Sequence, residues 1–429
     1  MKYPSIPSDL FISNRAKFMK AMKPNSVAVV VANDEMPRTG DANYSFRQHS
    51  DMLWLTGIDQ EETAVILCPD HPDPSRREML FLRKTNAHIA VWEGHKYTKE
   101  EGRAASGIQT VFWMDEFEDV LHNTLLFQNS IYVNLNENDR FKTKVHYANY
   151  RMALKLRKKY PGHSFERTGP IMMRLRSVKA QTEIDLMREA CRITELAFRR
   201  ILKFIKPGVY EYEIEAEIIH EFLRNRATGF AYSPIIASGK NACVLHYVEN
   251  KNQCQDGDML LMDFGAEYAN YAADLSRTVP VNGKFTDRQR EVYNAVLHVM
   301  KESTKMLVPG NNLNDYHRIV GNLMEVELIK LGLLNEAEVK AQDPNNPLYK
   351  KYFMHGTSHY IGLDVHDIGS RTEPFEEGMV FTCEPGIYIP DENIGVRIEN
   401  DIVITGEGPV DLMGSIPREA EEIEELMRG

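Results

Sequence analysis

The chain has 429 residues, more than one hydrophobic core usually organises, so we expect two domains. Its 43% apolar and 26% charged residues are ordinary for a globular protein and exclude a mainly disordered or fibrous chain. The net charge of −11 argues against nucleic acid as a partner, because such binding depends on clustered Lys and Arg along the phosphates.

The cysteines and the apolar runs indicate the compartment. Five cysteines are an odd number and none forms a C-x-x-C pair, so a disulfide framework is not expected and a reducing compartment fits best. Residues 1–22 lack the apolar stretch of a secretory signal. The longest apolar runs, such as residues 27–32, are far shorter than the roughly 20 residues of a membrane helix. We therefore expect a cytoplasmic protein with no membrane partner.

The first part of the chain predicts an α/β domain. Short β-rich runs alternate with polar, helix-compatible stretches, and these runs lie at residues 27–31, 64–68, 79–82 and 131–135. Regular structure breaks at residues 160–163, and Thr182 to Asp185 match a capping box that would open a long amphipathic helix running toward Phe204. We place the boundary near residue 174, which gives domains at 1–173 and 174–429.

The second part contains a weak internal repeat. The long helix ends at Lys206-Pro207-Gly208 and a helix over residues 211–226 follows. A helix from about Thr286 likewise ends at Val308-Pro309-Gly310 and is followed by one over residues 313–331. A strand-rich segment comes after each helix pair. The pattern indicates two similar halves that face each other across a cleft.

Four strand-like segments each carry an acidic residue in place of an apolar one, namely Asp263, Asp274, Glu384 and Glu399. A turn-like stretch at residues 265–270 would place the first two on adjacent antiparallel strands with their side chains on one face. Two carboxylates about 4 Å apart repel by about 4 kcal/mol at an effective dielectric constant of 20, so four of them need a compensating cation. Either divalent metal or the two nearby basic residues, Arg277 and Arg397, could compensate.

A histidine-rich segment lies between the second and third acidic residues. His355, His359 and His366 are separated by Gly and small polar groups, which is not the spacing of a helix core, and the segment lacks the Glu of the H-E-x-x-H zinc motif. With His246 they can supply one metal ligand and donors for a carbonyl oxygen. Oxygen-rich ligation with one imidazole suits Mn²⁺, Fe²⁺, Co²⁺ or Zn²⁺ at a two-metal site.

Residues 355–367 resemble the signature of the proline peptidases, which belong to the pita-bread metallopeptidase family, and residues 244–250, 384–388 and 397–399 resemble the neighbouring family segments. The resemblance implies two divalent metals, Mn²⁺ by preference. It also implies an α+β fold, with a C-terminal catalytic domain of duplicated helix and antiparallel-sheet halves and a smaller N-terminal α/β domain of the creatinase-like kind. The metal ligands it implies are Asp263, Asp274, His359, Glu384 and Glu399.

The N-terminal part is similar to the leading domain of the aminopeptidase P branch, at residues 25–26, 44–51, 55–57 and 92–94. In that branch the last of these segments approaches the active site of a neighbouring subunit. The resemblance therefore implies a homodimer or homotetramer in which Trp92 contacts the substrate of a neighbour.

The same resemblance implies a mechanism for peptides with proline in second position. A hydroxide that bridges the metals would attack the scissile carbonyl, and His246 and His366 would donate to its oxygen. Glu384 would take the proton of the water and pass it to the departing proline nitrogen. The residues assigned to hold the proline are His355, Tyr388 and Arg397.

Four alternatives share parts of this pattern. A prolidase has the same ligands but accepts only dipeptides, and a methionine aminopeptidase usually lacks the leading domain. Creatinase-like members have lost the metal ligands. An inactive peptide-binding or protein-binding module on the same fold would also be expected to lose them.

Overall fold

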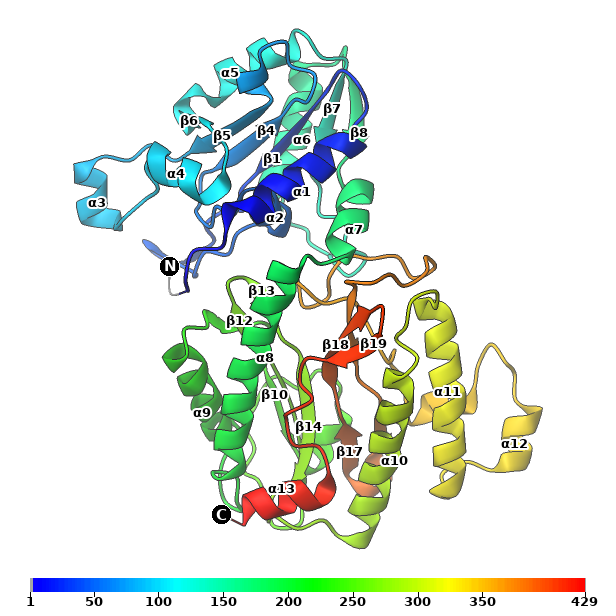
Figure 1. The fold of residues 1–429 in the computed structure, drawn as a ribbon. Helices are drawn as coiled ribbons and strands as arrows, with labels where there is room; N and C mark the ends of the chain where they lie inside the picture. The colour runs from blue at the N-terminus through cyan, green and yellow to red at the C-terminus, as the bar shows by residue number, and fades with distance from the viewer. Residues whose placement is uncertain (1–2, 429) are drawn as a thin grey trace. The chain divides into compact units, whose positions relative to one another are not determined.

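The computed structural model describes residues 3–428, which form two compact units, residues 3–176 and 177–428 (Figure 1). The units divide between Arg176 and Ser177, whereas the sequence placed its boundary after residue 173. Both units combine helices and sheets, which confirms the α+β class. Among residues 3–428, none of the helices has the length and apolar character that crossing a bilayer requires.

The N-terminal unit is built on one mixed six-stranded sheet, in the order β6-β5-β4-β1-β7-β8. Strand β1 is central and buried along its whole length, which explains its unbroken apolar sequence. The four strands expected from sequence are confirmed as β1, β4, β5 and β7. The strands are β1 Ser26–Val31, β4 Ala64–Leu67, β5 Glu78–Leu82, β6 Thr110–Trp113, β7 Ser130–Val133 and β8 Ser164–Arg167, with a separate hairpin of β2 Pro37–Thr39 and β3 Ala42–Asn43.

Alternate residues of this sheet form the core of the unit. Val27, Val29 and Val31 point to one face and pack with Phe117, Leu121 and Leu156 from helices α5 and α6. The helices of this part of the chain are α1 Ser8–Ala21, α2 Ser50–Thr56, α3 Ala87–Glu93, α4 Lys99–Ser106, α5 Phe117–Leu125, α6 Ala148–Lys159 and α7 Gly169–Ser177.

The C-terminal unit contains the two expected helix pairs, α8 with α9 and α10 with α11, and in Figure 1 the strands lie between the pairs. Helix α8 begins two residues earlier than the capping box predicts. Its N-cap is Ala180, whose N–H donates to the Glu183 side chain, so Thr182 is not the cap. The helices are α8 Gln181–Leu202, α9 Glu211–Arg224, α10 Asp287–Thr304, α11 Leu313–Lys330, α12 Glu336–Ala341 and α13 Ala420–Met427.

Strands follow each helix pair, as the internal repeat predicts. The first half has sheets β10-β11-β14 and β13-β12-β9, and the second has β15-β18-β19 and β16-β17. The halves join where the Glu399 N–H donates to the Ser276 carbonyl at 3.0 Å. The strands are β9 Gly229–Phe230, β10 Ile235–Ser238, β11 Met259–Phe264, β12 Ala266–Tyr268, β13 Tyr271–Ala272, β14 Leu275–Pro280, β15 Val380–Cys383, β16 Gly386–Ile389, β17 Ile394–Arg397, β18 Asn400–Thr405 and β19 Gly408–Asp411.

Candidate metal centre

The four acidic residues lie mainly at strand ends, not at the strand centres that the sequence suggested. Only Asp263 is inside a strand, β11, where it pairs with Ser276 of the antiparallel strand β14. Asp274 precedes β14, Glu384 follows β15, and Glu399 separates β17 from β18. At these interruptions the backbone leaves the regular ladder, so carboxylates from both halves can turn toward one point without following the strict alternation of a strand.

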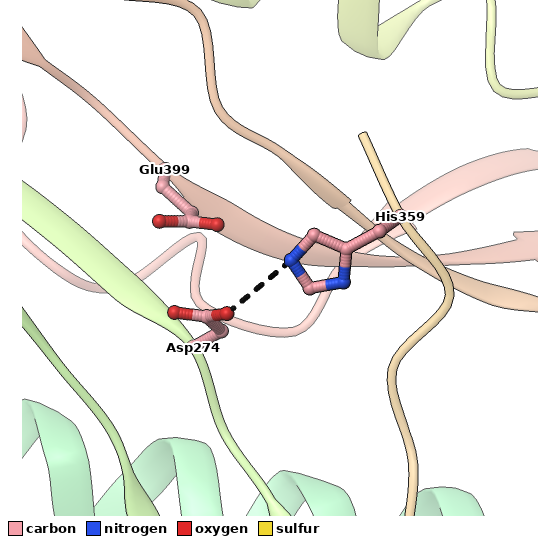
Figure 2. Close-up of side chains that lie close together, drawn as sticks. All are labelled: Asp274, His359 and Glu399. Carbon is pink, nitrogen blue, oxygen red and sulfur yellow. Dashed lines mark ion pairs between the residues drawn. The ribbon is translucent and has the colours of Figure 1, made fainter. Parts of the chain in front are cut away.

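His359 is prepared to act as a ligand through one nitrogen. Its Nδ1–H donates to the Tyr360 carbonyl at 2.9 Å, so the lone pair is on Nε2. That Nε2 lies 3.5 Å from Asp274 Oδ2. One ligand atom each from Asp274, His359 and Glu399 lie within 4.8 Å of one another, and Figure 2 shows the three side chains pointing together.

Asp263 and Glu384 complete the group of five. Glu384 Oε1 lies 3.6 Å from His359 Nε2. The Tyr232 hydroxyl contacts both Asp263 Oδ1 and Asp274 Oδ1, which brings these two carboxylates together. A phenol has one proton and can donate to only one carboxylate at a time. The second carboxylate is therefore accommodated only if it carries a proton or faces a cation.

The electrostatics of the cluster favour a cation. Burial, with the charge of neighbouring carboxylates, raises the pKa of Asp274 and Glu399 well above the ordinary range. Burial raises the pKa of Glu384 to about 7. Arg397 compensates the negative charge of Asp263, because its Nη2 lies 2.6 Å from Asp263 Oδ2. For this one carboxylate, the alternative of compensation by a basic residue therefore holds. The other carboxylates and the His359 Nε2 lone pair form an oxygen-rich donor set with one imidazole, which fits divalent metal.

The proposed proline-binding residues form a hydrogen-bonded chain beside the cluster. Arg397 Nη1 donates to the Tyr388 hydroxyl at 2.8 Å, and the hydroxyl contacts His355 Nε2 at 2.8 Å. His355 Nδ1 donates to the Gly356 carbonyl, so Nε2 accepts from Tyr388. Burial, followed by the charge of Arg397, lowers the pKa of His355 to about 3, so this histidine is neutral. Tyr388 is thus a buried aromatic residue whose hydroxyl has polar partners.

The other three predicted site residues, His366, His246 and Trp92, lie in different parts of the fold. The ring centres of His366 and His359 are 4.4 Å apart, so His366 borders the cluster of carboxylates and His359. His246 is exposed in a loop and is near enough to contribute to the lowered pKa of His355. Trp92 is 78% exposed on helix α3 of the N-terminal unit and is not part of the cluster within the C-terminal unit. The roles of all three stay predictions.

Sequence reasoning missed two side chains that contact the carboxylates of the cluster. Tyr232 has no distinguishing neighbours in the sequence, and only the fold brings it to Asp263 and Asp274. The Ser276 hydroxyl donates to Glu399 Oε2 at 2.6 Å and accepts from Arg397 Nε at 2.8 Å. A serine two residues after a predicted ligand, in a strand that also carries Arg277 and Thr278, was the available signal for the second of these.

Comparisons with known proteins agree with this arrangement. Residues 185–406 match metallopeptidase family M24, and residues 11–132 match the aminopeptidase P N-terminal domain. An Escherichia coli protein named Xaa-Pro aminopeptidase is 36% identical over 97% of each chain. The human Xaa-Pro aminopeptidase 3 is 30% identical over 94% of this chain and 81% of its own length.

Solved structures show the same fold. The structure of Escherichia coli aminopeptidase P with the inhibitor Pro-Leu has a TM-score of 0.87 at 34% identity, and the match covers 99% of both chains. The family match to the unit that contains the cluster, together with full-length similarity to these relatives, leads to one assignment: the chain belongs to metallopeptidase family M24 and carries an aminopeptidase P N-terminal domain.

Proposed function

We propose that the chain is an Xaa-Pro aminopeptidase, a metallo-exopeptidase that hydrolyses the bond between an N-terminal residue and a following proline. The observation that supports it most is the group of Asp263, Asp274, His359, Glu384 and Glu399. These five residues would hold two divalent metals, with Mn²⁺ preferred and Zn²⁺, Co²⁺ or Fe²⁺ also suited to the donor set. Metals held there would supply a nucleophile by lowering the pKa of a water, and would polarise the peptide carbonyl.

Glu384 would move the proton that the reaction requires. A carboxylate that takes a proton from water and returns it to the leaving nitrogen works best with a pKa near the working pH. Burial already raises the pKa of Glu384 to about 7. The leaving group is a secondary amine, which departs readily only when it is protonated, so this transfer is essential for a proline bond.

The histidines would stabilise the carbonyl oxygen as it gains charge. His366 lies next to His359, and His246 is near enough to His355 to contribute to its lowered pKa. Either N–H can donate to the developing oxyanion, and the loss of one such donor typically lowers the rate about 10²–10³-fold. A metal or Asp263 would hold the free amino group of the substrate, which would restrict cleavage to the first residue.

The proline ring would lie against His355, Tyr388 and Arg397. Proline has no N–H and a fixed φ, so a peptidase that binds substrates through a backbone ladder holds it poorly. The chain of hydrogen bonds from Arg397 through Tyr388 to His355 fixes these side chains in advance. A rigid wall of this kind suits a residue whose shape, rather than its hydrogen bonding, has to be recognised.

The rival within the family is a prolidase. The test compares an Xaa-Pro-Yaa tripeptide with an Xaa-Pro dipeptide, first with the chelated protein and then after addition of Mn²⁺. Metal-dependent release of free Xaa from the tripeptide supports the aminopeptidase. Cleavage of the dipeptide alone would assign a prolidase, and no cleavage of either would favour an inactive binding module.

The setting of the enzyme is also proposed. We expect a cytoplasmic homodimer or homotetramer in which exposed Trp92 meets the substrate of a neighbouring subunit. Light scattering of the purified protein gives the oligomeric state directly, and a monomer at micromolar concentration would contradict the proposal.

A further inference from the structure

A buried carboxylate lies outside the metal cluster and has no place in the mechanism above. Glu211, the first residue of α9, is fully buried and accepts five hydrogen bonds. Its Oε1 accepts from the Ser238 N–H at 2.8 Å, the Ser238 hydroxyl at 2.7 Å and Asn241 Nδ2 at 3.4 Å. Its Oε2 accepts from the Tyr247 hydroxyl at 2.7 Å and the Asn252 N–H at 2.8 Å. All five donors are neutral.

These five bonds hold both ends of one segment. Ser238 ends strand β10 and Asn241 lies in the short helical turn Gly239–Cys243, whereas Tyr247 and Asn252 lie beyond it. Residues 244–252 have no strand or helix of their own, so side chains must fix their path. His246 is the exposed residue directly before the anchored Tyr247.

The anchored segment also contacts the wall of the site. The Tyr247 ring belongs to the same apolar cluster as Tyr388, which carries the hydrogen-bonded chain to His355. A second anchor follows at Asn250, whose side chain accepts from the Ile236 N–H at 3.0 Å and donates to the Pro234 carbonyl at 3.0 Å. The segment therefore has little freedom on either side of His246.

We infer that Glu211 and Tyr247 are positioning residues that hold His246 in place for the reaction. The inference rests on the proposed function, in which His246 donates to the scissile carbonyl oxygen. Burying a carboxylate whose hydrogen-bond donors are all neutral costs free energy, so stability alone does not explain Glu211. Its five converging hydrogen bonds instead fix the path of the segment that carries His246. Misplacement of a catalytic group by about 1 Å can lower the rate about 10²-fold.

The test is a double-mutant cycle between Tyr247→Phe and His246→Ala, measured as kcat and KM for an Xaa-Pro-Yaa tripeptide with metal-loaded protein. We expect Tyr247→Phe to lower kcat about tenfold with little change in KM, and His246→Ala to lower it about 100-fold. In the His246→Ala background, Tyr247→Phe should have no further effect. A second variant, Glu211→Gln, replaces one carboxylate oxygen with an NH₂ group that faces N–H or O–H donors. Its effect on kcat should likewise disappear in the His246→Ala background.

The matched control is Tyr293→Phe, which also removes a buried tyrosine hydroxyl, one that donates to the Arg418 carbonyl at 2.8 Å. It should leave kcat unchanged. The inference is overturned if Tyr247→Phe lowers kcat equally in both backgrounds, or not at all when His246 is present. If His246→Ala leaves kcat unchanged while the tripeptide is cleaved, the proposed catalytic role of His246 is wrong. That outcome differs from one in which His246→Ala lowers kcat but Tyr247→Phe does not act through His246.

Discussion

Removal of the metals should invert the usual pH dependence of stability for this protein. In the folded, metal-free chain, burial raises the pKa of Glu384 from 4.5 to about 7. Between these values the folded state holds a proton that the unfolded state has released, so the free energy of unfolding falls as pH rises. Each pKa unit corresponds to about 1.4 kcal/mol, so the loss from this residue alone is about 3 kcal/mol between pH 4 and pH 8.

Urea unfolding of the chelated protein from pH 4 to pH 8 measures this loss. The three tryptophans, Trp54, Trp92 and Trp113, all lie in the N-terminal unit, so their fluorescence follows that unit while far-UV circular dichroism follows both. The variant Glu384→Gln, which cannot ionise, should lose about 3 kcal/mol less over this range in the circular dichroism transition and keep the fluorescence transition of the wild type. Parallel pH dependence of the two proteins would refute the reasoning.

Four further outcomes are expected. Because the carboxyl groups must ionise to bind metal, the Mn²⁺ affinity of the chelated protein should rise at least about tenfold from pH 6 to pH 8 by calorimetry, with proton release. Gly265→Ala should lower the bound metal measured by elemental analysis, because the new Cβ would lie 1.7 Å from the Ala273 carbonyl oxygen between the ligand strands. Arg277→Met should lower the free energy of unfolding by about 4 kcal/mol, since it removes hydrogen bonds to four buried acceptors, of which the Ser276 carbonyl keeps the Glu399 N–H as a partner. Trp92→Ala should change that free energy by less than about 0.5 kcal/mol but lower kcat/KM for the tripeptide severalfold if a neighbour uses Trp92.

Local patterns in the sequence predicted the elements that depend on local physics. The apolar run at β1 and the two helix pairs follow from burial and helical periodicity, which neighbouring residues determine. The cap of α8 was placed two residues late, because Thr182 has the better capping side chain but Ala180 has the extended backbone and the partner Glu183. Capping geometry depends on the path of the preceding chain, which the sequence does not reveal.

The four carboxylates of the proposed metal site could be predicted because unpaired acids among apolar residues are costly and need an explanation, and His359 followed from the family resemblance. Their supports could not. Tyr232 and Glu211 have no distinguishing neighbours in the sequence, and their contacts join residues far apart in the chain, such as Tyr232 with Asp274 and Glu211 with Asn252. Both contacts lie within the first half of the repeat and form only when its helices and strands pack together, so no local pattern reveals them.

The most direct test of the central claim is a stepwise addition of Mn²⁺ to the chelated protein, with free Xaa measured from Xaa-Pro-Yaa and from a matched Xaa-Ala-Yaa. We expect release from the proline peptide alone, rising until about two metal ions are bound per chain. Equal cleavage of the alanine peptide, or no release at any Mn²⁺ concentration, would contradict it.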